Sequence, residues 1–337
     1  GGTGYGHGVV VQRSRSIKGP YEIDEKRPVI TSQPEDFKER GIGESMKLHH
    51  YNPESYLQRS GHGTIVETLD GEVYISHLCS RPIMPMQRSV LGRETAIQKC
   101  YWTDDGWIKM VSGDNIAKQY VQAPNLEEVI VESLPERDDY KDSTLSNDYY
   151  SLREPVENHW LKIKDGLLEL RGRESLLSKY HQSFIGKKLT TFSSVTETCL
   201  VYKPENFMEM AGLTCYYNHT NFYYLRYYYS ESLGGPCLGI MLADNGKKGE
   251  LLEDRMPIES ADKVYLKAEI NVDKLQFYYA LIRNEWIKIG PLLDMTVLSD
   301  EYAHGFTGAF VGLSAQDQSK KKKWAKFEYF EHIKIDA

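Results

Sequence analysis

Hydrophobic and polar residues alternate with a period of two along much of the second half of the chain. The clearest stretch is KVYLKAEINVDKLQFYYALIRNEWIKIG, residues 263–290. Its regularly spaced apolar positions are Val264, Leu266, Ala268, Ile270, Leu275, Phe277, Tyr279 and Leu281. Such alternation predicts strands with one face buried and the other in water. We therefore expect an antiparallel β-sandwich of the jelly-roll type in this half of the protein.

Three hairpins are predicted where an Asp-Gly pair interrupts alternating hydrophobic residues. The pairs are Asp70-Gly71 within residues 61–78, Asp105-Gly106 within residues 96–110, and Asp165-Gly166 within residues 160–172. Asp-Gly favours the type I′ turn, whose twist matches that of the flanking strands. The first two hairpins follow each other closely, which is typical of a propeller blade or a barrel. The sequence contains no convincing amphipathic helix.

The strand pattern weakens in the middle of the chain and suggests a division into domains. Residues 113–138 are rich in acidic residues and proline, and we predict a linker there with one strand in VIVES, residues 129–133. The expected domains are residues 1–112 and 139–337. The polar stretch at residues 32–60, which contains the His49-His50 pair, is predicted to be a long surface loop.

Composition limits the classes of partner. The net charge of −7 argues against nucleic acid, which requires a concentrated basic face. The basic run Lys320–Lys323 is more simply a solvated loop between strands. No apolar segment approaches the roughly 20 residues that span a membrane, so we expect no membrane partner. Five cysteines without CxxC spacing indicate reduced thiols and a cytoplasmic protein. The alternative is a protein whose signal peptide was lost with the N-terminus.

Motifs that would identify a reaction from the residues alone are scarce. The opening GGTGYGHG is glycine-rich, but the following Val9–Val11 favours a strand over the helix that a phosphate loop needs. The sequence has no GxSxG motif, and its scattered histidines lack the spacing of a zinc site. The 24 tyrosines suit both half-buried sheets and sugar stacking. These features support a two-domain all-β protein for which carbohydrate is one candidate ligand class, and no more.

A resemblance to a known family goes further. GGTGYGH (1–7), GHGTIVET (61–68), HLCSRP (77–82) and LGRETAIQK (91–99) closely resemble the second half of a family 43 glycoside hydrolase. LRGRESL (170–176), AGLTCYYN (211–218), LQFYYAL (275–281) and FTGAFVGL (306–313) resemble the C-terminal domain of its β-xylosidase and α-L-arabinofuranosidase subgroup. The resemblance implies an all-β fold, the C-terminal part of a five-bladed β-propeller followed by a concanavalin-like (jelly-roll) β-sandwich.

The same resemblance implies an inverting glycosidase whose catalytic carboxylates are not in this chain. In the family the general-acid Glu stands immediately before the GGT motif, and here Gly1 is the first residue. The base and the tuning Asp lie further upstream in the family. We therefore expect an N-terminally truncated chain that is inactive alone. The alternative is a non-catalytic carbohydrate-binding or assembly module.

Three residues match family positions that contact the substrate. His62, in GHGTIVET, matches a His on the floor of the site. In some family members this His helps to hold a cation, so the resemblance implies a calcium ion near the propeller axis as one alternative. Arg93, in LGRET, matches an arginine that reaches the pocket. The alternative for Arg93 is an ordinary salt bridge on the side of the strand that carries Glu94. Phe310, in GAFVG, matches an aromatic that closes the pocket, against the alternative of a core Phe.

The resemblance implies xylo-oligosaccharide or arabinoside substrates, no required cofactor, and assembly as a homo-dimer or tetramer. The stretch at residues 35–60 is longer than expected for the family, and MPMQRSV (84–90) is shorter. Both segments border the pocket in the family, so the choice between xyloside and arabinoside stays open.

Overall fold

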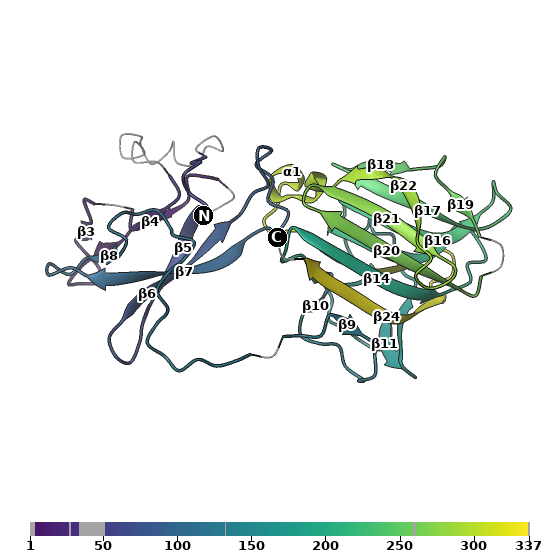
Figure 1. Ribbon diagram of the computed structural model, residues 1–337, viewed down its shortest axis with the longest axis horizontal. Helices are drawn as coiled ribbons and strands as arrows, with labels where there is room; N and C mark the ends of the chain where they lie inside the picture. The colour runs from purple at the N-terminus through teal and green to yellow at the C-terminus, as the bar shows by residue number, and fades with distance from the viewer. Residues whose placement is uncertain (1–3, 27, 34–50, 132, 259–260, 336–337) are drawn as a thin grey trace. The chain divides into compact units, whose positions relative to one another are not determined.

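The protein consists of two compact units built almost wholly from β-strands. The computed structural model describes residues 4–26, 28–33, 51–131, 133–258 and 261–335. The units are Gly1–Val131 and Glu132–Ala337. Within the described residues the helices are η3 (Met295–Leu298) and α1 (Asp300–Ala303), and no helix there is long and apolar enough to cross a membrane (Figure 1). The GGT triplet and residues 34–50 of the predicted surface loop at 32–60, which include the His49-His50 pair, lie outside the described residues. The described end of that stretch is not a surface loop, because residues 58–60 begin strand β5 (Gln58–Glu67) and are buried.

The first unit is organised around a four-stranded antiparallel meander. Its strands, in spatial order, are β5 (Gln58–Glu67), β6 (Val73–Ser80), β7 (Glu94–Trp102) and β8 (Ile108–Met110). Two short pairs accompany them, formed by β1 (Gly8–Val9) with β4 (Ile30–Thr31) and β2 (Gln12–Arg13) with β3 (Glu22–Ile23). A core that includes Ile30, Ile75 and Ile108 joins β4 to the meander. This meander has the form of a propeller blade.

All three predicted hairpins are present, but the turn type is right in one of them. Asp165 and Gly166 both have positive φ, 54° and 71°, as a type I′ turn requires. At the first hairpin only Gly71 has positive φ, and its N–H donates to the carbonyl of Thr68, which makes a type I turn followed by a glycine bulge. The Thr68 hydroxyl also accepts the N–H of Glu72 at 2.9 Å. At the second hairpin the Thr103 hydroxyl likewise accepts the N–H of Trp107. A threonine in Thr-x-Asp-Gly therefore favours this turn over the shorter type I′ turn.

The second unit contains two antiparallel sheets. The first sheet comprises, in spatial order, β10 (Tyr149–Ser151), β13 (Ser183–Lys188), β23 (Phe310–Asp317), β15 (Glu209–Asn218), β16 (Asn221–Ser230), β17 (Gly235–Asp244) and β18 (Lys247–Glu250), with β19 (Met256–Pro257) beside β17. The second comprises β11 (Leu161–Lys164), β12 (Leu167–Arg171), β24 (Trp324–Ile335), β14 (Ser193–Val201), β20 (Lys263–Asn271), β21 (Lys274–Ala280) and β22 (Ile287–Asp294), with β9 (Arg137–Asp138) beside β24. This arrangement confirms the predicted sandwich.

The predicted alternation holds along β20 and most of β21. Leu266 and Phe277 are fully buried, whereas Lys267 on the other face of β20 is only partly buried. Leu281 is the exception, because β21 ends at Ala280 and leaves Leu281 46% exposed. Hydrophobic positions inside the strands therefore form the core, and the last apolar residue lies beyond it.

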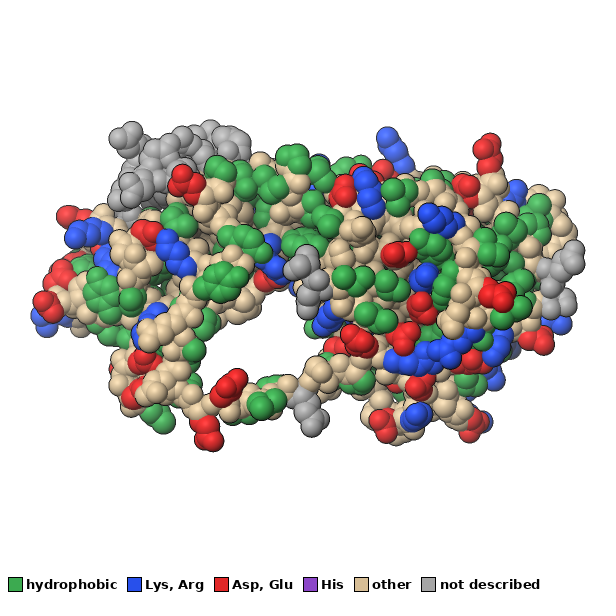
Figure 2. All heavy atoms as spheres, in the orientation of Figure 1, with side chains coloured by type: hydrophobic (Ala, Val, Ile, Leu, Met, Phe, Trp, Pro, Cys, Tyr) green, Lys and Arg blue, Asp and Glu red, His purple; other side chains and the backbone are tan. Residues whose placement is uncertain are grey.

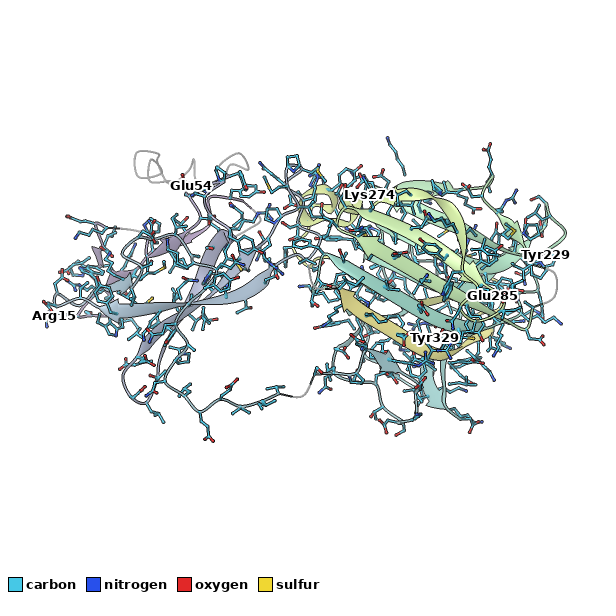
Figure 3. All side chains as sticks on the ribbon, viewed as in Figure 1. Arg15, Glu54, Tyr229, Lys274, Glu285 and Tyr329 are labelled. Atoms are coloured by element: carbon cyan, nitrogen blue, oxygen red, sulfur yellow. The ribbon has the colours of Figure 1, made fainter. Side chains whose placement is uncertain are left out.

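The outer faces of both sheets are more covered than the alternation predicts. Of the tyrosines in NFYYLRYYYS, only Tyr229 is not buried, so this run supplies packing and not a sugar-stacking platform. On the second sheet, Tyr329, which Figure 3 labels, is 2% exposed. The Arg137 guanidinium lies 3.7 Å from the centroid of its ring and covers it. Acidic and basic side chains intermingle over the face of this unit that Figure 2 shows. Long charged side chains thus cover aromatic rings while their ends stay in water.

The segment between β8 and β9 differs from its prediction. In the described residues from 111 to 136 the structure has no strand, and the expected strand in VIVES is not formed at 129–131 or 133. Val129, Ile130 and Val131 are 77%, 88% and 83% exposed. β-branched residues favour strands only when a neighbouring strand pairs with them, and none does here among the described residues.

A buried histidine inside the sandwich gives this unit a defined pH dependence. His332 on β24 is 3% exposed, and its Nδ1 lies 2.8 Å from the hydroxyl of Thr196. Burial, and to a smaller extent the charges of Lys187 and Lys334, lower the pKa of His332 from 6.5 to about 4, while the charge of Asp148 opposes them. The unfolded chain therefore binds more protons than the folded one between these values, so stability falls as the pH falls through this window.

We expect the free energy of unfolding to decrease by roughly 3 kcal/mol between pH 6.5 and pH 4 because of His332. Urea unfolding at several pH values measures it, and His332→Gln should flatten this part of the profile. The exposed His159 provides the control, because His159→Gln should leave the slope unchanged. An unchanged slope in His332→Gln would contradict the assignment.

Candidate functional site

The first predicted site residue, His62, lies at an irregularity in β5. The pairing of β5 with β6 shifts register on either side of Gly61, and His62 adopts φ 54° with an exposed side chain. A Cβ on Gly61 would lie 2.7 Å from the ring of His7, and one on Gly63 would lie 2.6 Å from Ile75. The two glycines of the GHG motif therefore let β5 approach its neighbours closely at the point where the bulge redirects His62.

His7 lies beside His62 and is held from both sides. The centroids of the two rings are 6.5 Å apart. Nδ1 of His7 donates to the carbonyl oxygen of Arg59 at 3.2 Å, and the backbone carbonyl of His7 accepts from the Thr31 hydroxyl at 2.8 Å. Burial lowers the pKa of His7, the charges of Arg93 and His62 lower it further, and the bond to Arg59 opposes them. His7 is consequently held as a neutral imidazole at neutral pH.

The second predicted residue, Arg93, lies within electrostatic range of His7. It follows Gly92, which has φ 70°, and directly precedes β7 with a half-buried side chain. Its charge acts on His7, which places it within electrostatic range of the histidines. The neighbouring Glu94 is instead held by Arg81, through Nη2 at 2.7 Å and Nε at 3.0 Å from its two oxygens. The salt bridge on this strand is thus made by Arg81.

Arg59 is a member of this region that sequence reasoning missed. It is 2% exposed, with its guanidinium 4.5 Å above the ring of Tyr5 and Nη1 donating to the Ser89 hydroxyl at 3.1 Å. Its backbone carbonyl binds His7, so Arg59 positions that ring. The available signal was an arginine in QRSGHG, three residues before His62, in a strand otherwise rich in small residues.

The third predicted residue, Phe310, is part of the second unit and is not placed by the structure in the His62 cluster. It is the first residue of β23, is half-buried, and packs edge-on against Tyr150 with ring centroids 5.6 Å apart. It borders the cluster of buried aromatics that includes Tyr216 and Phe222. Its role at a pocket stays a prediction.

The surroundings of His62 do not fit a calcium ion by themselves. Calcium takes six to eight oxygen ligands, whereas the His7 imidazole beside His62 offers only nitrogen. No three His, Cys, Asp or Glu side chains in the described part of the chain come together to hold a metal. Metal binding at His62 stays a prediction.

The cluster of His62, His7 and Arg93 is suited to binding a polar, hydroxyl-rich or anionic group. Neutral imidazole both donates and accepts hydrogen bonds, and the guanidinium adds up to five donors and a permanent charge. The three side chains come from β5, from the segment before β1 and from the turn before β7. Binding and positioning are the functions that these groups can perform.

Comparison with known proteins identifies the two units. Glycosyl hydrolases family 43 matches residues 1–108, and the β-xylosidase C-terminal concanavalin A-like domain matches residues 137–332. The chain is 37% identical to a xylan 1,3-beta-xylosidase of Vibrio sp over 349 residues, which are 99% of this chain and 61% of the relative. It is 36% identical to a beta-xylosidase of Bacillus subtilis (strain 168), over 98% of this chain and 61% of that protein.

Solved structures agree. The crystal structure of xylan beta-1,4-xylosidase from Bacillus halodurans C-125 matches with a TM-score of 0.90 and 39% identity, over 99% of this chain and 61% of that one. The chain thus spans about three fifths of the length of the relatives that it matches, 61% in each of these cases. The protein belongs to glycoside hydrolase family 43, in the group whose members carry the C-terminal concanavalin A-like domain.

Proposed function

We propose that this chain is part of an exo-acting β-xylosidase-type enzyme that hydrolyses xylo-oligosaccharides or arabinosides with inversion. Family membership and the activities named for its relatives support the glycosidase class. The single observation that carries the proposal for this chain is the convergence of His62, His7 and Arg93 from three separate segments. Two imidazoles and one guanidinium provide donors for the hydroxyls of a sugar ring.

Under this proposal the chain binds sugar, and carboxylates from an upstream segment carry out the reaction. An inverting glycosidase needs one carboxylic acid and one carboxylate on opposite sides of the scissile bond. Three acidic residues of the first unit are already bound to lysine or arginine: Glu94 to Arg81, Asp24 to Lys109 and Glu72 to Lys99. The bond from Lys99 lowers the pKa of Glu72, which is the opposite of what a general acid requires.

The residues of this chain have distinct tasks in this scheme. Arg93 donates hydrogen bonds to a sugar hydroxyl or to an upstream carboxylate, and so orients the group that it binds. His62, exposed at the bulge of β5, presents its ring to the sugar, while His7 and Arg59 hold that part of the strand in place. Rigid support of this kind is needed because small displacements of contacting groups are costly in catalysis.

Hydrolysis of 4-nitrophenyl β-xyloside and 4-nitrophenyl α-arabinofuranoside tests the proposal. The 337-residue chain alone is expected to show no turnover above background, and addition of the upstream segment of the protein should restore release of the sugar. Proton NMR of the first-formed anomer would report inversion. Clear turnover by the chain alone would mean that its own carboxylates perform the reaction. Failure of the extended protein on both substrates would overturn the proposed activity.

A further inference from the structure

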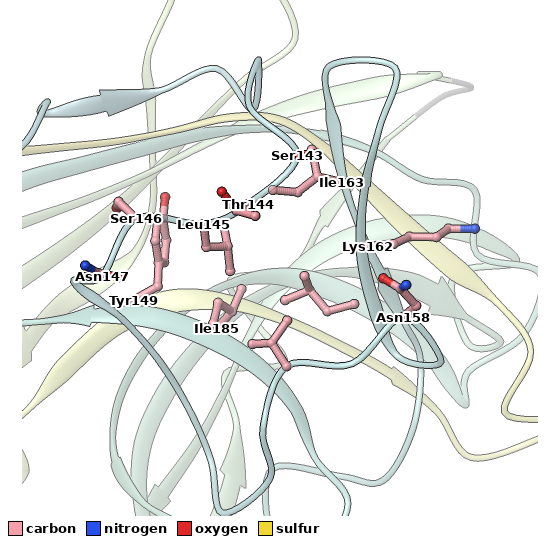
Figure 4. A pocket seen from close by; sticks show the side chains of 12 residues that line it. Ser143, Thr144, Leu145, Ser146, Asn147, Tyr149, Asn158, Lys162, Ile163 and Ile185 are labelled. Carbon is pink, nitrogen blue, oxygen red and sulfur yellow. The ribbon is translucent and has the colours of Figure 1, made fainter.

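The second unit contains a cavity that the proposed active site does not use. It has a volume of about 390 Å³ and is lined by residues from five segments of the sandwich (Figure 4). They are Ser143, Thr144, Leu145, Ser146, Asn147, Tyr149, Val156, Asn158, Leu161, Lys162, Ile163 and Ile185. Sites for small molecules generally measure about 300–1,000 Å³, so the cavity is large enough for roughly one or two sugar rings.

The position of the cavity follows from the ends of the two sheets. Tyr149 is on β10, the edge strand of the first sheet, and Leu161 and Ile163 are on β11, the edge strand of the second. Neither edge strand has a further strand beside it among the described residues. Loops 143–147 and 156–158 therefore complete the walls where regular pairing stops.

The lining combines an apolar floor with a neutral polar rim. Ile185 and Leu161 are 1% and 3% exposed, and Figure 4 shows the side chains of Ile163 and Ile185 within the same cavity. The rim carries hydroxyls and amides, from Ser143, Thr144, Asn147 and Asn158. These four residues are exposed to solvent. An apolar floor below groups that both donate and accept hydrogen bonds matches the two faces of a sugar ring.

The charged groups next to the cavity are already neutralised. Nζ of Lys162 lies 3.0 Å from Oε2 of Glu169 and 4.4 Å from the centroid of the Trp324 ring. Asp148, in the wall loop, forms an ion pair of 2.7 Å with Lys187. A charged ligand would have to compete with these ion-pair partners and would lose hydration, which disfavours it relative to a neutral one.

We propose that this cavity is an accessory binding site for a neutral sugar, separate from the His62 cluster. The choice of a xylose-based ligand rests on the proposed function, whereas the cavity and its neutral lining do not. The hydroxyls of the sugar bond to the amides of Asn147 and Asn158 and to the hydroxyl of Thr144. Its C–H face lies on Leu161, Ile163 and Ile185. The site would hold a chain of the substrate on the sandwich without contributing to bond cleavage.

Isothermal titration calorimetry of the 337-residue chain with xylotriose tests the proposal, with cellotriose and glucuronic acid as further ligands. Asn158→Trp, which fills the mouth from an exposed position, should weaken xylotriose binding by at least about tenfold. The double variant Thr144→Ala/Asn158→Ala removes rim contacts without added bulk and should also weaken it. Gln318→Trp places the same ring at an exposed amide outside the cavity and should leave binding unchanged.

Each outcome distinguishes the cavity from the proposed active site. Loss of xylotriose binding in both cavity variants but not in Gln318→Trp would support the accessory site. Loss in Arg93→Ala alone would assign the binding to the first unit and overturn the accessory site, while leaving the proposed function intact. No measurable binding of any neutral sugar, or tighter binding of glucuronic acid than of xylotriose, would also overturn it.

Discussion

Replacing Arg93 with alanine is expected to lower kcat/KM for nitrophenyl β-xyloside by about a hundredfold in the protein that carries the upstream segment. The half-buried guanidinium is always charged, and under the proposed function its loss leaves a sugar hydroxyl or an upstream carboxylate without a partner. Arg93→Lys should recover only part of the activity, because an ammonium ion cannot reproduce the planar set of donors. Steady-state kinetics of the three proteins measures the effect.

A second measurement tests the same cluster without requiring activity. The charge of Arg93 contributes to lowering the pKa of His7, after the larger effect of burial. Arg93→Ala in the 337-residue chain should therefore raise the pKa of His7 in an NMR titration. If that pKa does not move, Arg93 is not part of this cluster.

Arg81→Ala provides the matched control for the kinetic experiment. Arg81 is an arginine of the same unit whose guanidinium is engaged with Glu94 on β7. Its removal should lower the thermal midpoint while leaving kcat/KM within about threefold of the parent protein. An equal loss of kcat/KM in Arg81→Ala and Arg93→Ala would indicate a general structural effect and contradict a specific role for Arg93.

Replacing Asp317 with alanine is expected to lower the free energy of unfolding of the second unit by about 3–5 kcal/mol. Asp317 ends β23, is 1% exposed, and its carboxylate organises the loop that leads to β24. Backbone N–H groups of Ser319, Lys320, Lys322 and Lys323 donate to it at 2.8–3.1 Å. Without the carboxylate, these donors lose their partner, and chemical denaturation measures the cost.

The pH dependence separates this effect from that of His332. Burial by itself would raise the pKa of Asp317, but the hydrogen bonds from Ser319 and the loop N–H groups outweigh it and hold the pKa well below the usual 3.8. This contribution is therefore present above the unfolded pKa and is lost as the pH falls below it. Asp317→Asn should remove most of this pH-dependent stabilisation, because the amide has one acceptor oxygen instead of two. The exposed Asp165→Asn serves as the control. A loss below about 1 kcal/mol in Asp317→Ala would contradict the role of the carboxylate.

The Lys320–Lys323 run illustrates how a sequence feature acquires its explanation in the structure. Four consecutive lysines in an acidic chain could form a basic patch or an ordinary loop. The structure places them between β23 and β24, with backbone N–H groups bound to Asp317 and the side chain of Lys323 paired with Glu205 at 3.0 Å. This loop therefore requires a backbone whose N–H groups reach the carboxylate of Asp317.

The sequence by itself determined the strands, the hairpins and the family. Period-two alternation located the strands because a residue's side of a sheet depends only on its position along the strand. Asp-Gly located the three hairpins because glycine tolerates positive φ. Turn type was not determined, since the hydroxyls of Thr68 and Thr103 compete for backbone groups and favour the longer turn. The strand expected in VIVES, residues 129–133, was also not determined by the sequence alone, because a strand forms only where a neighbouring strand pairs with it.

Only the tertiary structure decided which distant residues act together. His7, His62 and Arg93 are far apart in the sequence, and the glycine contacts of β5 and the turn before β7 bring them within electrostatic range. The burial of Arg59, the coverage of Tyr329 by Arg137 and the cavity between β10 and β11 likewise depend on neighbours from other segments. Local patterns reflect the geometry of one strand, whereas burial, charge compensation and cavities are properties of several strands packed together.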